Sequence, residues 1–130
     1  MNGEKPITLE ILPEEFVICQ IGSAAEADLS QSFTFLSRTD EELSLVCPRE
    51  AAPCLPLKME AGYRCLRIQG VLDFSLVGIL SGIAACLAER KIPLFALSTF
   101  NTDYILVKEN HLPGARAALE EKGYQMTEGA

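Results

Sequence analysis

The length and composition of the chain are those of a folded globular protein. Its 130 residues suffice for one domain, or for two very small units that share a core. Hydrophobic residues make up 48% and charged residues 22%, which argues against a disordered or low-complexity chain. The 18 acidic residues exceed the 11 basic ones and give a net charge of −7. Nucleic acids and anionic membranes attract basic surfaces, so we expect neither as a partner.

The five cysteines and the single histidine have no metal-binding or catalytic spacing. No two cysteines are spaced as C-x-x-C, and their odd number argues against a disulfide framework. Cys19, Cys65 and Cys86 lie among apolar residues, and we expect them to be small buried side chains. His111 has no second histidine to pair with, which disfavours a metal site or a catalytic triad. We therefore expect neither a metal nor a cofactor.

The start of the chain and its apolar stretches favour a cytoplasmic protein. The first 15 residues hold four glutamates and lack the long apolar run of a secretory signal peptide. The longest apolar stretch, Leu76–Ala88, is shorter than the about 20 residues that a membrane-spanning helix requires.

The first half of the chain is predicted to form mainly short strands. Ile7–Leu12 alternates apolar and polar residues, as a half-buried strand does, and Pro13–Glu15 breaks the pattern. Phe16–Ile21 predicts a second strand, a candidate hairpin partner of the first. Ser23 is in position to cap a short helical turn through Ala24–Leu29.

A second hairpin and a proline-rich connector complete this half. Phe33–Arg38 and Leu43–Cys47 are strand-like, with residues 39–42 as the turn between them. The stretch 48–62 carries three prolines and Gly62, so we expect a connector there and a boundary between two parts of the chain.

The second half predicts a regular alternation of strands and helices. Tyr63–Ile68 alternates as a strand does, and a helix follows over roughly Leu76–Arg90. The helix has an apolar stripe that we expect to be buried: Leu76, Ile79, Leu80, Ile83 and Leu87. Two strands, a helix and a last strand come next: Leu94–Thr99, Asp103–Lys108, Leu112–Lys122 and Tyr124–Thr127. The order β-α-β-β-α-β is that of a ferredoxin-like unit of the α+β class.

The two halves also resemble each other in sequence. At an offset of 61 residues Leu36 falls on Leu97, Leu45 on Leu106, and Glu42 on Asp103. The hairpin of the first half is then a diverged copy of the hairpin in the second half. We interpret the chain as a tandem duplication whose first member has lost its helices.

Topology predicts where a ligand would bind. In a β-α-β-β-α-β unit, the loop Gly70–Gly78 and the hairpin turn Phe100–Thr102 lie at the same end of the sheet. The start of the helix offers unpaired N–H groups that suit a ligand carboxylate, and Gly78 lets a ligand approach them. Asp103 suits a ligand ammonium or guanidinium group. Together these features predict a site for a free amino acid.

Each of these residues also has a purely structural interpretation. An aspartate after Asn-Thr in a turn often serves only to bond its own backbone, which would explain Asp103. A glycine such as Gly78 can simply permit close packing of a helix on a sheet. Spacing alone leaves both interpretations open.

Three segments resemble the ACT domain: Asp73–Leu80, Leu87–Glu89 with Ile92, and above all Leu97–Val107, which reads LSTFNTDYILV. More narrowly, the chain is similar to small bacterial tandem ACT-domain proteins related to the CASTOR arginine sensors of animals. The resemblance covers residues 60–125 strongly and residues 1–59 weakly. It implies a degenerate ACT-like half over residues 1–59 and an ACT domain over residues 60–130.

The resemblance also implies a function. ACT domains are regulatory modules that bind amino acids at domain interfaces and usually pair through their sheets. We therefore expect an amino-acid sensor, a homodimer, and a separate target protein. The implied ligand-binding residues are Ser75, Leu76, Val77, Gly78, Ile79, Ser81, Thr99, Phe100, Asn101, Thr102 and Asp103. The arginine sensors carry an acidic residue where this chain has Ser81, so the resemblance does not extend to arginine as the ligand.

Two other functions stay open at this point. The chain could be a structural partner with a vestigial site, or a small ferredoxin-like enzyme. The enzyme is disfavoured because the sequence shows no nucleophile beside a base.

Overall fold

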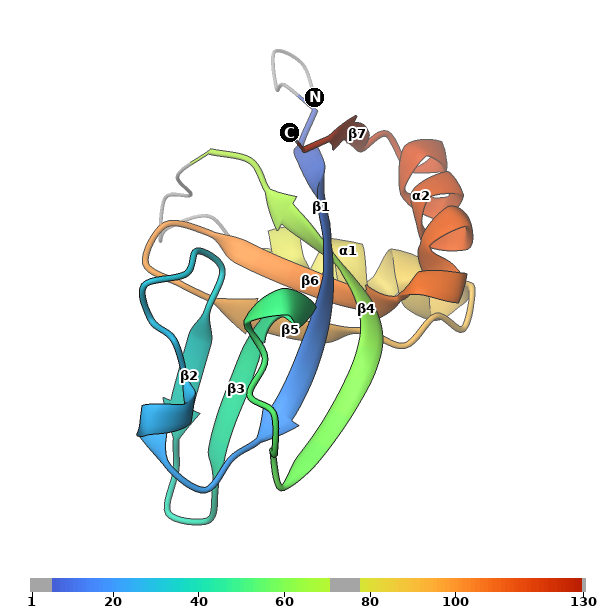
Figure 1. Cartoon of the computed structure of the whole chain (residues 1–130). Helices are drawn as coiled ribbons and strands as arrows, with labels where there is room; N and C mark the ends of the chain where they lie inside the picture. Colours follow the sequence, from blue (N-terminus) through green and yellow to red (C-terminus); the bar gives the residue numbers. More distant parts are fainter. Residues whose placement is uncertain (1–5, 71–77, 130) are drawn as a thin grey trace. The chain divides into compact units, whose positions relative to one another are not determined.

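The computed structural model describes residues 6–70 and 78–129 (Figure 1). The chain divides into two compact units. The terminal unit comprises Met1–Pro13 and Arg64–Ala130, and the inserted unit comprises Glu14–Tyr63. The chain enters the inserted unit within strand β1 (Thr8–Gln20) and leaves it within strand β4 (Lys58–Ile68). No helix among the described residues is long and apolar enough to cross a membrane.

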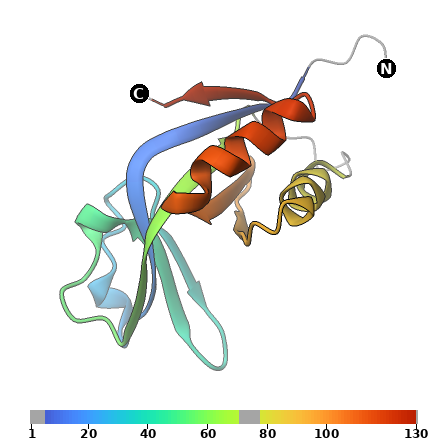
Figure 2. The ribbon, with the colours of Figure 1, turned by 90° about the vertical axis from the view of Figure 1, so that its right-hand side faces the viewer.

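The terminal unit has the predicted α+β architecture, with two helices packed on a sheet. Its elements after β4 are α1 (Ile79–Glu89), β5 (Phe95–Ser98), β6 (Asp103–Lys108), the 3₁₀ turn η3 (Glu109–His111), α2 (Leu112–Glu121) and β7 (Gln125–Glu128). Both helices cover the same face of the sheet (Figure 2). The predicted ferredoxin-like fold class is thus confirmed, and the predicted elements of this half are recovered with small shifts at their ends.

One strand pairing departs from the simple β-α-β-β-α-β pattern. The order in the terminal unit is β7, β1, β4, β6, β5, so the first part of β1 lies between the last strand and β4. β7 pairs in parallel with β1, from Thr8 opposite Gln125 to Ile11 opposite Glu128. The sequence-based assignment placed the start of the chain outside this unit, because local patterns do not reveal strand partners.

The prediction of a hairpin between Ile7–Leu12 and Phe16–Ile21 is wrong. The structure has one continuous strand, β1, through Pro13. Thr8–Ile11 pairs with β7 and Phe16–Gln20 pairs with β3, so Pro13 falls between these two ladders. Neither ladder needs the N–H group that a proline lacks, which is why the strand is not interrupted there.

The core of the terminal unit lies between the helices and the sheet. Ile83 and Leu87 are fully buried, as the apolar stripe predicted, and Leu119 of α2 is buried in the same core. Ile79 and Leu80 are half-buried and pack against this core, and Leu76 lies outside the described residues. Burying a Leu or Ile side chain contributes roughly 1.5–3 kcal/mol, so the stripe is a major source of stability for α1.

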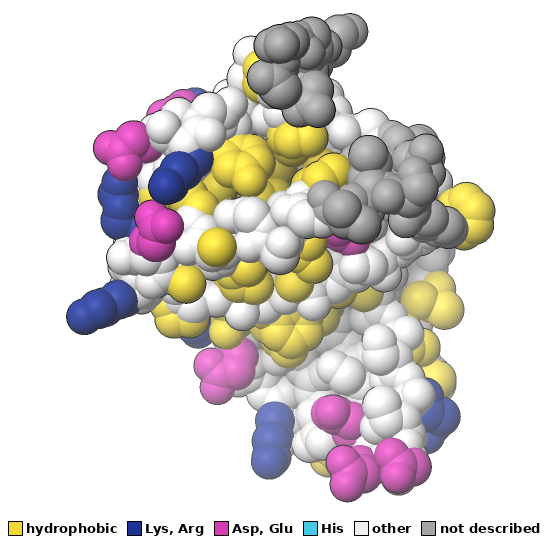
Figure 3. All heavy atoms as spheres, turned by 180° about the vertical axis from the view of Figure 1, so that it is seen from behind, with side chains coloured by type: hydrophobic (Ala, Val, Ile, Leu, Met, Phe, Trp, Pro, Cys, Tyr) yellow, Lys and Arg dark blue, Asp and Glu magenta, His cyan; other side chains and the backbone are white. Residues whose placement is uncertain are grey.

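Seen from behind, the face that bears α1 is largely hydrophobic or uncharged (Figure 3).

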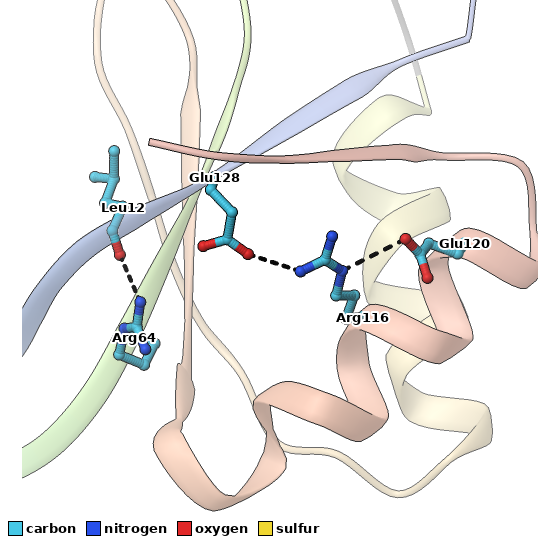
Figure 4. A network of polar contacts seen from close by, with 5 residues as sticks. All are labelled: Leu12, Arg64, Arg116, Glu120 and Glu128. Carbon is cyan, nitrogen blue, oxygen red and sulfur yellow. Dashed lines mark hydrogen bonds and ion pairs between the residues drawn. The ribbon is translucent and has the colours of Figure 1, made fainter. Parts of the chain in front are cut away.

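Polar contacts attach β7 to α2. Arg116 Nη1 donates to Glu128 Oε2 at 2.7 Å, and Arg116 Nε donates to Glu120 Oε2 at 3.4 Å (Figure 4). These two carboxylates, Glu128 first, raise the pKa of the Arg116 guanidinium. In the same view Arg64 Nη2 donates to the backbone oxygen of Leu12 at 3.0 Å and links β4 to β1. The short C-terminal strand is thus held by side chains as well as by its ladder.

The inserted unit is built of strands and two short 3₁₀ turns. β1 pairs with β3 (Leu43–Pro48), which forms a hairpin with β2 (Phe35–Arg38). The predicted helical turn is shorter than expected: η1 covers Ala24–Glu26, with Ser23 and Glu26 in a capping box. The expected connector 48–62 holds a second turn, η2 (Arg49–Ala51), and the start of β4. The core of the inserted unit comprises Val17, Cys19, Ile21, Leu43, Leu45 and Cys47.

The structure corrects the offset between the two similar hairpins from 61 to 60. Phe35 pairs with Val46 and Phe95 pairs with Leu106, so the two ladders superpose at an offset of 60 residues. A shift of one residue would turn every side chain to the opposite face. The counterpart of Asp103 is therefore Leu43 rather than Glu42. At the same offset η2 coincides with η3, which supports the interpretation as a repeat. The division into halves at residue 59 stays a prediction.

Candidate functional site

Gly78 starts α1 in a conformation that suits glycine. Its φ of 84° lies in the left-handed region, and Gly78, as the N-cap residue, has no side chain that could cap the helix. The first helical hydrogen bond runs from Gly82 N to Gly78 O at 2.8 Å. The N–H groups of Ile79, Leu80 and Ser81 precede it and have no acceptor within the helix. The start of α1 thus presents a positive end that suits an anionic group.

The two glycines of this region have different neighbours. Among the described residues, a Cβ on Gly78 would meet only Ser81 Oγ, at 3.9 Å, so packing against the described sheet does not account for Gly78. Ser81 Oγ itself donates to Gly78 O at 3.2 Å. A Cβ on Gly82 would come within 3.1 Å of the Tyr124 hydroxyl oxygen, so this side chain closely approaches the backbone of α1, as a glycine inside a helix predicts. Gly82 therefore serves packing, and Gly78 serves the turn into the helix.

Thr102 attaches the β5–β6 turn to the end of β4. Its Oγ1 donates to the backbone oxygen of Ile68 at 2.7 Å, and the residue is only 5% exposed. Thr99 N donates to Thr102 O at 2.8 Å and closes the turn. The turn and the end of β4 therefore lie together, as the topology predicted. In Figure 1, α1 begins toward the end of the sheet at which this turn lies.

Asp103 begins β6 and is half-buried. Its Oδ1 accepts a hydrogen bond from Ser98 Oγ at 2.6 Å, across the register pair that these two residues form. A carboxylate can accept several hydrogen bonds, so this contact orients Asp103 without using its full capacity. Asp103 thus has a structural hydrogen bond, but its partner is the Ser98 side chain and not the backbone of its own turn.

The other predicted site residues are partly described. Phe100, at the tip of the turn, is 80% exposed, and Asn101 beside it is exposed. Ser75, Leu76 and Val77 lie outside the described residues. The structure therefore describes the turn and the first helical turn of the predicted site, but not the loop before the helix. Within the described ranges, no group of three or more His, Cys, Asp or Glu side chains is arranged to hold a metal ion.

Residues 58–121 match the family model of the ACT domain. The matched segment includes β4, α1, the β5–β6 hairpin and α2, and therefore all eleven predicted ligand-binding residues. No curated protein matches the chain.

Several solved structures are similar to the chain. A crystal structure of a protein from Agobacterium tumefaciens has a TM-score of 0.85 at 29% identity, covering 98% of this chain and 96% of that one. A protein of unknown function from Vibrio cholerae, described as a possible transport protein, has a TM-score of 0.69 at 24% identity, with 88% of each chain covered. An aspartate kinase from Clostridium acetobutylicum, described as an allosteric enzyme, has a TM-score of 0.59 at 12% identity. That match covers 83% of this chain and 33% of the kinase.

Proposed function

We propose that the chain is a non-catalytic regulatory module that binds a small free amino acid at the start of α1. ACT domains are generally regulatory modules that bind amino acids, and residues 58–121 match that family model. The observation that carries the proposal is the hydrogen bond from Thr102 to Ile68, which holds the β5–β6 turn at the end of β4. The start of α1 and the carboxylate of Asp103 would then belong to the same end of the terminal unit.

The ligand would use both ends of its zwitterion. Its carboxylate would accept hydrogen bonds from the N–H groups of Ile79–Ser81, which have no acceptor within α1. Its ammonium group would donate to Asp103 and to the carbonyl groups of the turn Thr99–Asn101. Ser75, Leu76 and Val77, which the resemblance to ACT domains also implies as ligand-binding residues, lie outside the described residues.

The regulatory role in this proposal implies a partner. The aspartate kinase with a similar fold is described as an allosteric enzyme, and the chain covers a third of it. We propose that this chain regulates a separate target protein as a cytoplasmic amino-acid sensor and that it acts as a homodimer. A relation to the CASTOR arginine sensors is part of the same proposal. The ligand would differ from arginine, because this chain has Ser81 where those sensors carry an acidic residue.

The experiment is a thermal-shift screen of the twenty amino acids, followed by calorimetric titration of the one that stabilises the protein. Asp103→Ala should weaken its binding about 10- to 150-fold, because a charge-assisted hydrogen bond contributes about 1.5–3 kcal/mol. Asp103→Asn is the sharper variant, since its side-chain oxygen can still accept from Ser98 while the charge is lost. Wild-type affinity in both variants would contradict the site.

A second outcome tests the function itself. If none of the twenty amino acids raises the melting temperature of the wild type, the sensor is excluded and the structural partner with a vestigial site is favoured. Glu41→Gln is the control, because Glu41 is exposed on the β2–β3 turn of the inserted unit, away from the proposed site, and should leave affinity within about twofold.

A further inference from the structure

We draw no further inference here: the strongest candidate, the exposed apolar surface of Leu55 and Leu57 in the proline-rich segment just before β4 of the inserted unit, carries none because nothing in the structure shows what covers it.

Discussion

Burial sets the chemistry of the cysteines in the inserted unit. Cys19 and Cys47 are buried in its core, and all five cysteines of the chain are free thiols. Cys47 is only 1% exposed, and burial, with a smaller effect of Cys19, raises the pKa of its thiol from 9.0 to about 11. Burial also raises the pKa of Cys19. These thiols are therefore protonated and unreactive at neutral pH, as expected for small core residues. Cys54 is exposed, and so differs from the other four.

The pKa of Cys47 predicts a loss of stability at high pH. Between pH 9 and about 11 the unfolded chain releases the Cys47 proton while the folded protein retains it. The stabilisation is fully present below pH 9 and is lost as the pH rises through about 11, since the folded state binds more protons. The loss should be on the order of 1 kcal/mol at pH 11, after solvent screening is allowed for. Urea unfolding at pH 8, 9, 10 and 11 measures it.

The variant Cys47→Ala separates this effect from other titrations. It should be less stable than wild type at pH 8 because it leaves a small cavity, but its stability should fall less steeply above pH 9. Equal slopes for the variant and the wild type would show that Cys47 does not carry the pH dependence.

At the scale of elements, α1 and α2 end in the same conformation with different residues. The residue after the last turn is Lys91 in α1, with a φ of 58°, and Gly123 in α2, with a φ of 99°. Both positions lie in the left-handed region that usually favours glycine at a helix end. Lys91 is exposed and is held by hydrogen bonds of the helix end, including Lys91 N to Ala88 O at 2.9 Å. The end of α1 is therefore strained in a way that the end of α2 is not.

Exchanging the residue types should change stability in opposite directions. Lys91→Gly removes a left-handed strain of about 1–2 kcal/mol but makes the unfolded chain more flexible, so a net gain of about 0.5–1 kcal/mol is expected. Gly123→Ala introduces the strain and should cost about 1 kcal/mol or more. A Cβ at Gly123 meets no described atom within 4 Å, so the cost would come from the backbone conformation and not from a clash. Chemical denaturation of both variants is the measurement. A less stable Lys91→Gly would show that the lysine side chain outweighs the strain.

The sequence predicted the elements better than their partners. Helical periodicity located α1 and α2, and alternation located β5 and β6, because these patterns depend on which face is buried. The parallel pairing of β7 with Thr8–Ile11 joins segments more than a hundred residues apart, and no local pattern encodes it. Pro13 favours a break in the sequence pattern, but β1 continues through it, because a proline is tolerated where no neighbouring ladder needs its N–H group. The Leu36–Leu97 and Leu45–Leu106 identities favour an offset of 61, whereas the pairing register requires 60.

The candidate site was predictable to a similar degree. A glycine at position 78 and the topology of the sheet were sufficient to predict that the start of α1 and the β5–β6 turn lie at the same end of the sheet. The contact of Thr102 with Ile68 could not be predicted, since a threonine in a turn gives no sign of a buried acceptor.

At the scale of the whole molecule, the free edge of β5 bears on the proposed homodimer. Among the described strands, β5 pairs only with β6 and ends the order of the terminal unit. An unpaired edge can accept a strand from another chain. Thr99 N donates toward β6, and donors alternate along a strand, so the N–H groups of Ala96 and Ser98 point to the free edge. We expect two chains to pair along this edge.

Sedimentation of the protein at tens of micromolar should therefore give a particle of twice 14.2 kDa. Ala96→Pro removes one N–H group from the free edge and none from the β5–β6 ladder, so it should weaken the dimer while the circular dichroism of the fold is retained. Ala96→Ser keeps the N–H group on the same exposed position and should remain a dimer. A wild type that sediments as a 14.2 kDa monomer would contradict the dimer. A dimer that persists in Ala96→Pro would place the interface elsewhere, because a proline cannot donate the edge hydrogen bond that this pairing requires.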